Sequence, residues 1–408
     1  ISTLITKGTT PTSIGGKFSK TGIPFVKVES ISESGGLIPE KFAFIDVQTD
    51  ELLKRSRIQQ NDVLFSIAGT IGRVALVESK YKVMNTNQAV ALIRPDINKI
   101  DSKFLYFSLR DIKRLQTAKS KVVQSVQANF SLGELKKLEI DLPSKSEQKA
   151  ISHILGTLDE KIELNKKTNQ TLDEIAKALF KSWFIDFDPV RAKSEGRSTG
   201  LPNDISKLFP DSFVQSELGQ IPSGWGIQSL GSISKISSGK RPKSRSETKT
   251  IIAKYPLYGG AGPMGFTNEF LVNGTKVITT GRVGTLGKFF RIKMPTWISD
   301  NALIVEPSDL FYNFCFYRLL NFDINIFNRG STQPLITQSD LKTIEMISAD
   351  EKLHKVFERL CSDLFAKFEI NQNESNMLEQ IRNCLLPKLI SGELRITDAE
   401  KMIAEIGI

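Results

Sequence analysis

The chain has 408 residues, of which 40% are hydrophobic and 25% charged, so it is long enough for two domains with their own cores. Its formal net charge is +10, which favours a polyanionic partner such as nucleic acid. Three cysteines without a CxxC pair argue against a disulfide framework or a zinc site. No apolar run is long enough to span a membrane, and we expect a protein of the reducing cytoplasm.

Residues 1–145 are predicted to form a first globular domain that is rich in short strands. Runs of β-branched and aliphatic residues at 63–67 and 89–93 are bounded by Gly, Asn and Pro, as strands are. A short helix is expected near 104–115. Ser131 and Glu134 have the spacing of a capping box, which predicts a further helical turn.

Basic and polar side chains follow the expected short helix of this domain. Cations on a loop beside a firm scaffold can bind phosphates, and nearby amides and hydroxyls can reach base edges. The candidate DNA-binding residues here are Lys113, Arg114, Lys119, Lys121, Gln124, Ser125 and Gln127. The alternative interpretation is an ordinary solvated surface loop.

Residues 146–185 are predicted to form a long helix. Apolar residues recur every three or four positions, which is typical of a helix that pairs with an antiparallel partner. The expected contact stripe consists of Ile151, Ile154, Leu158, Ile162, Asn165, Asn169, Leu172, Ile175 and Leu179. Its polar centre, Asn165 and Asn169, is predicted to set the register of the pair or to contact a partner. A solvated stretch in an ordinary helical bundle is the alternative.

A polar, proline-containing segment, 186–220, is interpreted as a connector to a second globular domain, 221–348. The second domain has expected strands at 277–280 and 303–305, and an expected short helix near 311–320. Thr337 and Asp340 repeat the capping pattern. The candidate DNA-binding residues of this domain are Lys240, Arg241, Lys243, Arg245, Ser331, Thr332 and Gln333, and an ordinary solvated surface loop is again the alternative.

A second long helix is predicted at 349–390, followed by a C-terminal tail at 391–408. Its contact stripe is Phe357, Leu360, Leu364, Phe368, Asn371, Ser375, Leu378, Ile381 and Leu385. Asn371 and Ser375 again form a polar centre, with the same expected role in register or partner docking.

The two halves of the chain repeat each other. Glu163 and Glu369 are 206 positions apart (369 − 163 = 206), and the same offset relates Asn165 to Asn371 and 130–140 to 336–346. Further upstream the offset drifts, as loops of unequal length require. The sequence therefore predicts two copies of one unit, each a globular domain followed by a long helix, related by an internal pseudo-twofold.

Catalytic motifs are not evident in the sequence. The two histidines, His153 and His354, do not occupy matching positions and have no convergent partners at catalytic or metal-ligand spacing. The glycine-rich stretches GTIG and GRVGTLG lack the spacing of a dinucleotide or phosphate loop and favour tight turns. We expect neither a catalytic nor a metal site.

The stretches 147–193 (EQKAISHILGTLDEKIELNKK…), 201–225 (LPNDISKLFPDSF…IPSGW) and 385–396 (LLPKLISGELRI) resemble type I restriction-modification specificity (S) subunits. The resemblance, with the two-copy layout, covers essentially the whole chain. It departs at the front, where IPSGW has no counterpart before Ile1, so the first copy is expected to lack its first turns.

The resemblance implies an α/β (α+β) fold with two target recognition domains joined by two long antiparallel coiled-coil helices. It also implies that each domain reads one half of a bipartite sequence in double-stranded DNA. The expected partners are two methyltransferase (M) subunits and restriction (R) subunits. These partners would carry S-adenosylmethionine, ATP and magnesium, with no cofactor in this chain. Two alternatives stay open, namely the DNA-recognition part of a fused restriction-modification enzyme and a stand-alone DNA-binding protein.

Overall fold

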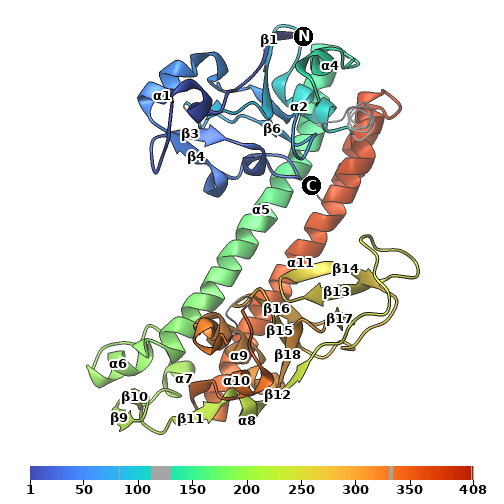
Figure 1. The fold of residues 1–408 in the computed structure, drawn as a ribbon. Coiled ribbons are helices and arrows are strands. Elements are labelled where there is room, and N and C mark those ends of the chain that lie inside the picture. The colour runs from blue at the N-terminus through green and yellow to red at the C-terminus, as the bar shows by residue number, and fades with distance from the viewer. Residues whose placement is uncertain (82, 112–129, 330–333, 406, 408) are drawn as a thin grey trace. The chain divides into compact units, whose positions relative to one another are not determined.

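The computed structural model describes residues 1–408 except 82, 112–129, 330–333, 406 and 408 (Figure 1). The chain forms two compact units: the first joins 1–166 to 372–408, and the second holds 167–371. The boundaries fall inside the two long helices, α5 and α11, which span Lys145–Phe184 and Glu351–Ile390. Each unit therefore contains one globular domain and a part of each long helix.

The first unit contains two four-stranded sheets. One has the strand order β1-β8-β5-β6 and is antiparallel, and the other has the order β2-β4-β3-β7, with β3 and β7 parallel. The strands are β1 (Ser2–Lys7), β2 (Phe18–Ser19), β3 (Ile23–Val26), β4 (Ala43–Ile45), β5 (Val63–Ser66), β6 (Val74–Leu76), β7 (Asn85–Thr86) and β8 (Val90–Pro95). The predicted strands at 63–67 and 89–93 are confirmed as β5 and β8.

The strand β5 is buried on both faces. Val63 and Phe65 belong to the core shared with the helices, whereas Leu64 belongs to a second cluster with Val26 and Met84. Successive side chains of a strand point to opposite faces, so a strand covered on both sides needs apolar residues at every position. The apolar run 63–65 follows from this double burial, and the buried hydroxyl of Ser66 at the end of the strand donates to the Thr70 carbonyl at 2.6 Å.

The helices of the first unit are short apart from α5 and α11. They are α1 (Val47–Leu52), α2 (Ser102–Arg110), α4 (Leu132–Lys136) and α12 (Ile396–Glu405), with 3-10 turns at Pro11–Ile14, Val28–Ser30, Pro39–Lys41 and Lys54–Ser56. The predicted capping box of Ser131 and Glu134 is confirmed at the start of α4. The expected helix at 104–115 begins two residues earlier and ends at Arg110. Ala399 and Ile403 of α12 are buried in the core of the unit, so the expected C-terminal tail is partly folded.

The second unit repeats the topology of the first. Its antiparallel sheet has the order β12-β18-β15-β16, and the parallel pair β13–β17 corresponds to β3–β7. The strands are β9 (Phe213–Ser216), β10 (Gly219–Pro222), β11 (Gly226–Ser229), β12 (Ser234–Ser238), β13 (Tyr255–Gly259), β14 (Gly262–Thr267), β15 (Val277–Gly281), β16 (Phe289–Ile292), β17 (Trp297–Ile298), β18 (Ala302–Pro307) and β19 (Glu345–Ser348). The predicted internal repeat is thereby confirmed at the level of strand order.

The helices of the second unit complete the correspondence. They are α6 (Asp188–Ser194), α7 (Asn203–Ser206), α8 (Leu230–Ile233), α9 (Tyr312–Leu320) and α10 (Gln338–Lys342), with 3-10 turns at Asp309–Phe311 and Ile324–Phe327. α9 corresponds to α2, and α10 to α4, including the predicted capping box of Thr337 and Asp340. Among the described residues, no helix combines the length and the apolar character needed to cross a membrane.

The long helices keep the 206-residue offset from end to end (351 − 145 = 206 and 390 − 184 = 206). Most residues of the two predicted stripes are buried or half-buried, but Ile175 is 48% exposed and its assignment to the stripe is wrong. Ala176 and Phe180 are buried instead. The second half of α5 belongs to the second unit and packs against the aromatic residues there. Its buried positions are therefore shifted by one residue from the predicted stripe.

Residues 186–220, which the sequence suggests are a polar connector, hold α6, α7 and most of the hairpin β9–β10 (Figure 1). Several of their apolar side chains, including Val190 and Phe209, join the core of the second unit. The Phe209 ring lies 5.1 Å from that of Trp183 on α5, in an edge-to-face arrangement. Aliphatic and aromatic side chains spaced along this mostly polar segment therefore pack it onto the domain.

Candidate nucleic-acid interface

The basic loop that follows β12 is fixed to the domain at its base. We call residues 239–254 the basic arm. A Cβ on Gly239 would lie 2.1 Å from the Ser299 carbonyl oxygen, so only glycine fits there. The Lys240 N–H donates to the Ile298 carbonyl at 2.9 Å, and the Trp297 Nε1–H donates to the Lys240 carbonyl at 2.6 Å. The backbone carrying the first cation therefore has a defined position.

A second anchor holds the arm to β14. Ser246 and Phe266 exchange two backbone hydrogen bonds, each 2.8 Å long. The close approach requires Gly265, whose φ is +130° and whose Cβ would meet the Ser246 oxygen at 2.3 Å. Residues 247–254 extend beyond this anchor. The arm therefore projects from the sheet and is held to it by backbone hydrogen bonds at two places.

The structure places the four predicted cations of the second domain on this arm. Lys240, Arg241, Lys243 and Arg245 are all at the surface, and Lys243 forms an ion pair of 3.2 Å with Glu269. That pairing reduces the capacity of Lys243 for a phosphate. The arm contains one acidic residue, Glu247. A locally cationic, anchored surface is what phosphate binding requires.

The other predicted DNA-binding residues lie outside the residues that the structure describes. These are Lys113, Arg114, Lys119, Lys121, Gln124, Ser125 and Gln127 in the first unit, and Ser331, Thr332 and Gln333 in the second. The described ends of both segments are equivalent in the two units. The Phe130 N–H donates to the Ile67 carbonyl at 2.8 Å, and the Ile336 N–H donates to the Arg282 carbonyl at 3.0 Å. Phe130 and Ile336 therefore lie beside the glycine-rich turn that precedes β6 in the first unit and β16 in the second.

Two further polar side chains, Arg282 and Asn301, lie beside this turn of the second unit, and no motif in the sequence marks them. The Arg282 N–H donates to the Asn301 carbonyl at 2.9 Å, and the Asn301 Oδ1 accepts from the Gly260 N–H at 3.3 Å. Arg282 is half-buried and Asn301 is exposed, so both are candidates for base or phosphate contacts. The GRVG stretch is the available signal in the sequence, and by itself it indicates only a turn.

The edge of the first unit has the same backbone design with less charge. Gly8 stands where Gly239 stands in the second unit, with its Cβ position 1.7 Å from the Thr86 oxygen. The Thr10 hydroxyl donates to the Gln88 Oε1 at 2.5 Å. Residues 8–17, which follow β1, contain a single cation, Lys17. The two units therefore have similar scaffolds at this edge and differ in the charge of the loops there.

The four polar residues at the centres of the long helices are buried. In the first unit the Asn165 Nδ2 donates to the Glu374 Oε2 at 2.8 Å, and Ser375 is buried nearby on α11. In the second unit the Asn371 Nδ2 donates to the Asn169 Oδ1 at 2.9 Å, and the Asn169 Nδ2 donates to the Phe368 carbonyl at 3.1 Å. Buried, specifically paired amides favour a role in setting helix register over direct partner docking.

Neither histidine belongs to a catalytic arrangement in the described part of the chain. His153 is exposed on α5, whereas His354 bonds the Ser348 hydroxyl at 2.8 Å among the rings of Phe184, Phe311 and Phe314. Burial lowers the pKa of His354 to about 4, so the ring is neutral near neutral pH. Within the described residues, no group of three or more His, Cys, Asp and Glu side chains could hold a metal ion.

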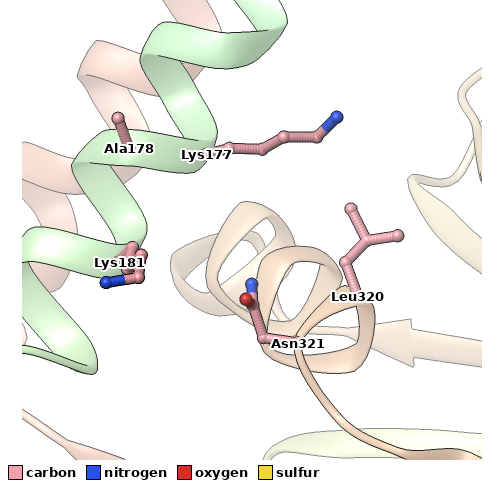
Figure 2. A pocket seen from close by; sticks show the side chains of 5 residues that line it. All are labelled: Lys177, Ala178, Lys181, Leu320 and Asn321. Carbon is pink, nitrogen blue, oxygen red and sulfur yellow. The ribbon is translucent and has the colours of Figure 1, made fainter. Parts of the chain in front are cut away.

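A hollow of about 370 Å³ between α5 and the end of α9 also lacks catalytic groups (Figure 2). It is lined by Lys177, Ala178, Lys181, Leu320 and Asn321. The Lys177 Nζ pairs with Asp173 at 2.6 Å, and Lys181 pairs with Asp186. A nucleophile with an adjacent base is not part of this lining.

Glu358 has a perturbed pKa with a structural explanation. Its carboxylate accepts hydrogen bonds of 2.8 and 2.9 Å from the N–H groups of Asn313 and Phe314, at the start of α9. Burial raises the pKa of Glu358 to about 7, and these hydrogen bonds only partly oppose that shift. Glu358 therefore caps the N-terminus of α9 from the neighbouring helix α11, and it does not line the hollow described above.

We expect Glu358→Gln to flatten the pH dependence of stability in the second unit. Because the pKa of Glu358 is raised on folding, its contribution is fully present below the unfolded value near 4.5 and is lost as pH rises through about 7. Thermal unfolding of both proteins between about pH 5 and pH 8 measures the effect. The wild type should lose stability relative to the variant as pH rises. Parallel curves would contradict the assignment.

The comparisons with known proteins agree with this architecture. The family model described as "Type I restriction modification DNA specificity domain" matches residues 2–174 and again 222–380. The HindI specificity subunit of Haemophilus influenzae is 24% identical over 428 residues, covering 88% of this chain and 93% of that protein. The MjaIX specificity subunit of Methanocaldococcus jannaschii is 26% identical over 359 residues, covering 82% and 78%.

A solved structure shares the fold. The type I restriction-modification S subunit of M. genitalium superposes with a TM-score of 0.53 at 20% sequence identity, covering 95% of this chain and 96% of that one. The family match covers both copies of the repeat, including the domains that carry β1 and β12. This chain therefore belongs to the family of type I restriction-modification DNA specificity domains, and it contains two of them.

Proposed function

We propose that this chain is the DNA specificity subunit of a type I restriction-modification complex, in which each unit reads one half of a bipartite target. The observation that carries the proposal is the repeated domain, whose main sheet has the same strand order in both copies while the loop chemistry differs. One scaffold used twice would present two reading surfaces, and the differing loops would give two different half-sites.

The partners follow from the same proposal. The chain would bind double-stranded DNA, two methyltransferase (M) subunits and restriction (R) subunits. S-adenosylmethionine, ATP and magnesium would be bound by those partners, and the chain itself would be non-catalytic. The long helices could dock these partners on their outer faces, because Asn165, Asn169 and Asn371 are already hydrogen-bonded in the seam between the helices.

Equivalent apolar residues on the outer faces support two copies of one docking surface. Leu164 of α5 lies in the first unit and is 57% exposed. Ile370 of α11 lies in the second unit and is 59% exposed, and it is 206 positions later (370 − 164 = 206). Exposed aliphatic side chains at repeated positions fit the same partner twice.

We expect Leu164→Asp and Ile370→Asp each to remove one of two M subunits. A charge placed in an apolar contact should weaken that contact by about thirtyfold or more. Native mass spectrometry of co-expressed complexes gives the stoichiometry, with two M subunits for the wild type, one for each single variant and none for the double variant. Two M subunits on the double variant would place the docking surface elsewhere.

Co-expression with the M subunit tests the proposed function as a whole. Sequencing of methylated bases in the host DNA should give one bipartite motif that is absent without this chain. The chain alone, incubated with DNA, magnesium and S-adenosylmethionine, should neither methylate nor cleave. Activity in that control would favour the fused-enzyme alternative. Sequence-specific binding without any partner would favour a stand-alone DNA-binding protein.

A further inference from the structure

The tip of the basic arm presents two large apolar side chains to solvent. Ile251 is 97% exposed and Ile252 is 75% exposed, more than any other large apolar side chain in the described part of the chain. Full exposure of one isoleucine is ordinary, but two adjacent ones at the end of a projection are a surface that association with a partner would bury.

The tip is held in shape by its own hydrogen bonds. The Thr250 N–H donates to the Ala253 carbonyl at 3.0 Å, and the Ala253 N–H donates to the Thr250 Oγ1 at 2.9 Å. Behind the tip, the rings of Tyr255 and Phe270 meet edge to face at 5.1 Å. Together with the Ser246–Phe266 anchor, these contacts allow the isoleucines to enter a partner with little ordering cost.

The charge around the tip identifies the chemistry of that partner. Cations precede and follow the isoleucines along the arm: Lys240, Arg241, Lys243, Arg245, Lys249 and Lys254. The Lys254 Nζ lies 5.1 Å from the centre of the Tyr255 ring, beside the tip. Six cations and one acidic residue surround the two isoleucines. A matching partner carries many negative charges and also offers apolar surface in its interior. Duplex DNA has these two features in its phosphates and its stacked bases.

We propose that Ile251 and Ile252 form an apolar wedge that enters a base step of duplex DNA while the flanking cations hold the adjacent phosphates. Minor-groove proteins use isoleucine, leucine or phenylalanine in this way to unstack a step and kink the duplex. The proposal rests on the proposed DNA-reading function and adds a distortion step specific to the second unit. Residues 8–17, the equivalent loop of the first unit, contain one isoleucine, Ile14, and one cation.

The test uses the complex of this chain with its M subunit and duplexes of the methylation motif. 2-Aminopurine is placed at successive positions across the site, because its fluorescence rises when a step is unstacked. Ile251→Ala with Ile252→Ala removes the wedge, and Ile251→Met with Ile252→Met preserves its apolar bulk. The matched control is Val214→Ala with Leu218→Ala, on the β9–β10 hairpin. Its segment 211–222 contains two acidic residues and no Lys or Arg.

Methyltransferases flip their target base out of the duplex, so the methylated positions should fluoresce in every complex and are left out of the comparison. At one further step, the wild type, the methionine variant and the hairpin control should raise fluorescence, and the alanine variant should not. Loss of the wedge should also weaken binding by about tenfold. Unchanged fluorescence and affinity in the alanine variant would overturn the wedge. Loss of the M subunit from that variant would also overturn it, because the tip would then be a protein contact. Failure of the wild-type complex to bind any duplex would instead overturn the proposed function, and the wedge with it.

Discussion

Replacing Lys240, Arg241, Lys243 and Arg245 together by glutamine is expected to weaken DNA binding by on the order of a thousandfold at about 0.1 M salt. Neutralising a phosphate releases condensed counterions, so the slope of log K against log salt should fall by about 0.9 for each phosphate that the variant leaves unneutralised. Because Lys243 is already paired with Glu269, the decrease in slope should correspond to three phosphates rather than four. Binding titrations of the M-subunit complex at several salt concentrations measure both quantities.

A control with the same change in charge separates this effect from general electrostatics. Lys352, Lys355, Arg359 and Lys367 are exposed on α11 in the same unit. Their replacement by glutamine should leave the salt slope close to that of the wild type. If the slope decreases in the control and not in the arm variant, the DNA follows the helix and the arm faces away from it.

Asp159→Ala is expected to lower the free energy of unfolding of the first unit by about 3 kcal/mol. The carboxylate of Asp159 on α5 lies 2.5 Å from the Arg382 Nη1 of α11 and 2.9 Å from the Arg110 Nη1 of α2. Both arginines are largely buried, so removal of their shared anion leaves two positive charges in a low-dielectric setting. Calorimetric unfolding gives the loss as a downward shift of the first unit's transition.

The second copy supplies a matched replacement for this ion triad. The equivalent residues are Phe365 (159 + 206), Ala176 (382 − 206) and Leu320 (110 + 210, the offset of α2 to α9). Asp159→Phe, Arg382→Ala and Arg110→Leu combined should recover most of the stability that Asp159→Ala loses, because the buried charges are removed together. Equal instability of the two variants would show that packing around Asp159, and not charge, sets the loss.

The repeated elements are predictable from the sequence because their signals are local. Capping residues such as Ser131 and Thr337 mark the short helices, and the 206-residue offset locates the long ones. Contacts between distant segments leave no such signal. The ion triad of Asp159, Arg110 and Arg382 joins three helices, and nothing in the sequence pairs these residues.

The packing of 186–220 is not predictable from the sequence. The segment is polar on average, and composition does not reveal that a few side chains such as Val190 and Phe209 meet an aromatic core. Four of the six cations of the basic arm are predicted as DNA-binding residues from charge alone. Arg282 and Asn301 escape prediction because backbone hydrogen bonds bring them together, and Ile251 and Ile252 escape it because exposure is a property of the fold.

The proposal that each unit reads one half-site is tested most directly by a domain exchange followed by sequencing of methylated bases. Residues 1–141 are replaced by the corresponding domain of another family member, and the chimaera is co-expressed with the M subunit. The account predicts that one half of the bipartite motif changes to that of the donor while the other half is retained. A motif in which both halves change, or neither does, would contradict independent reading by the two units.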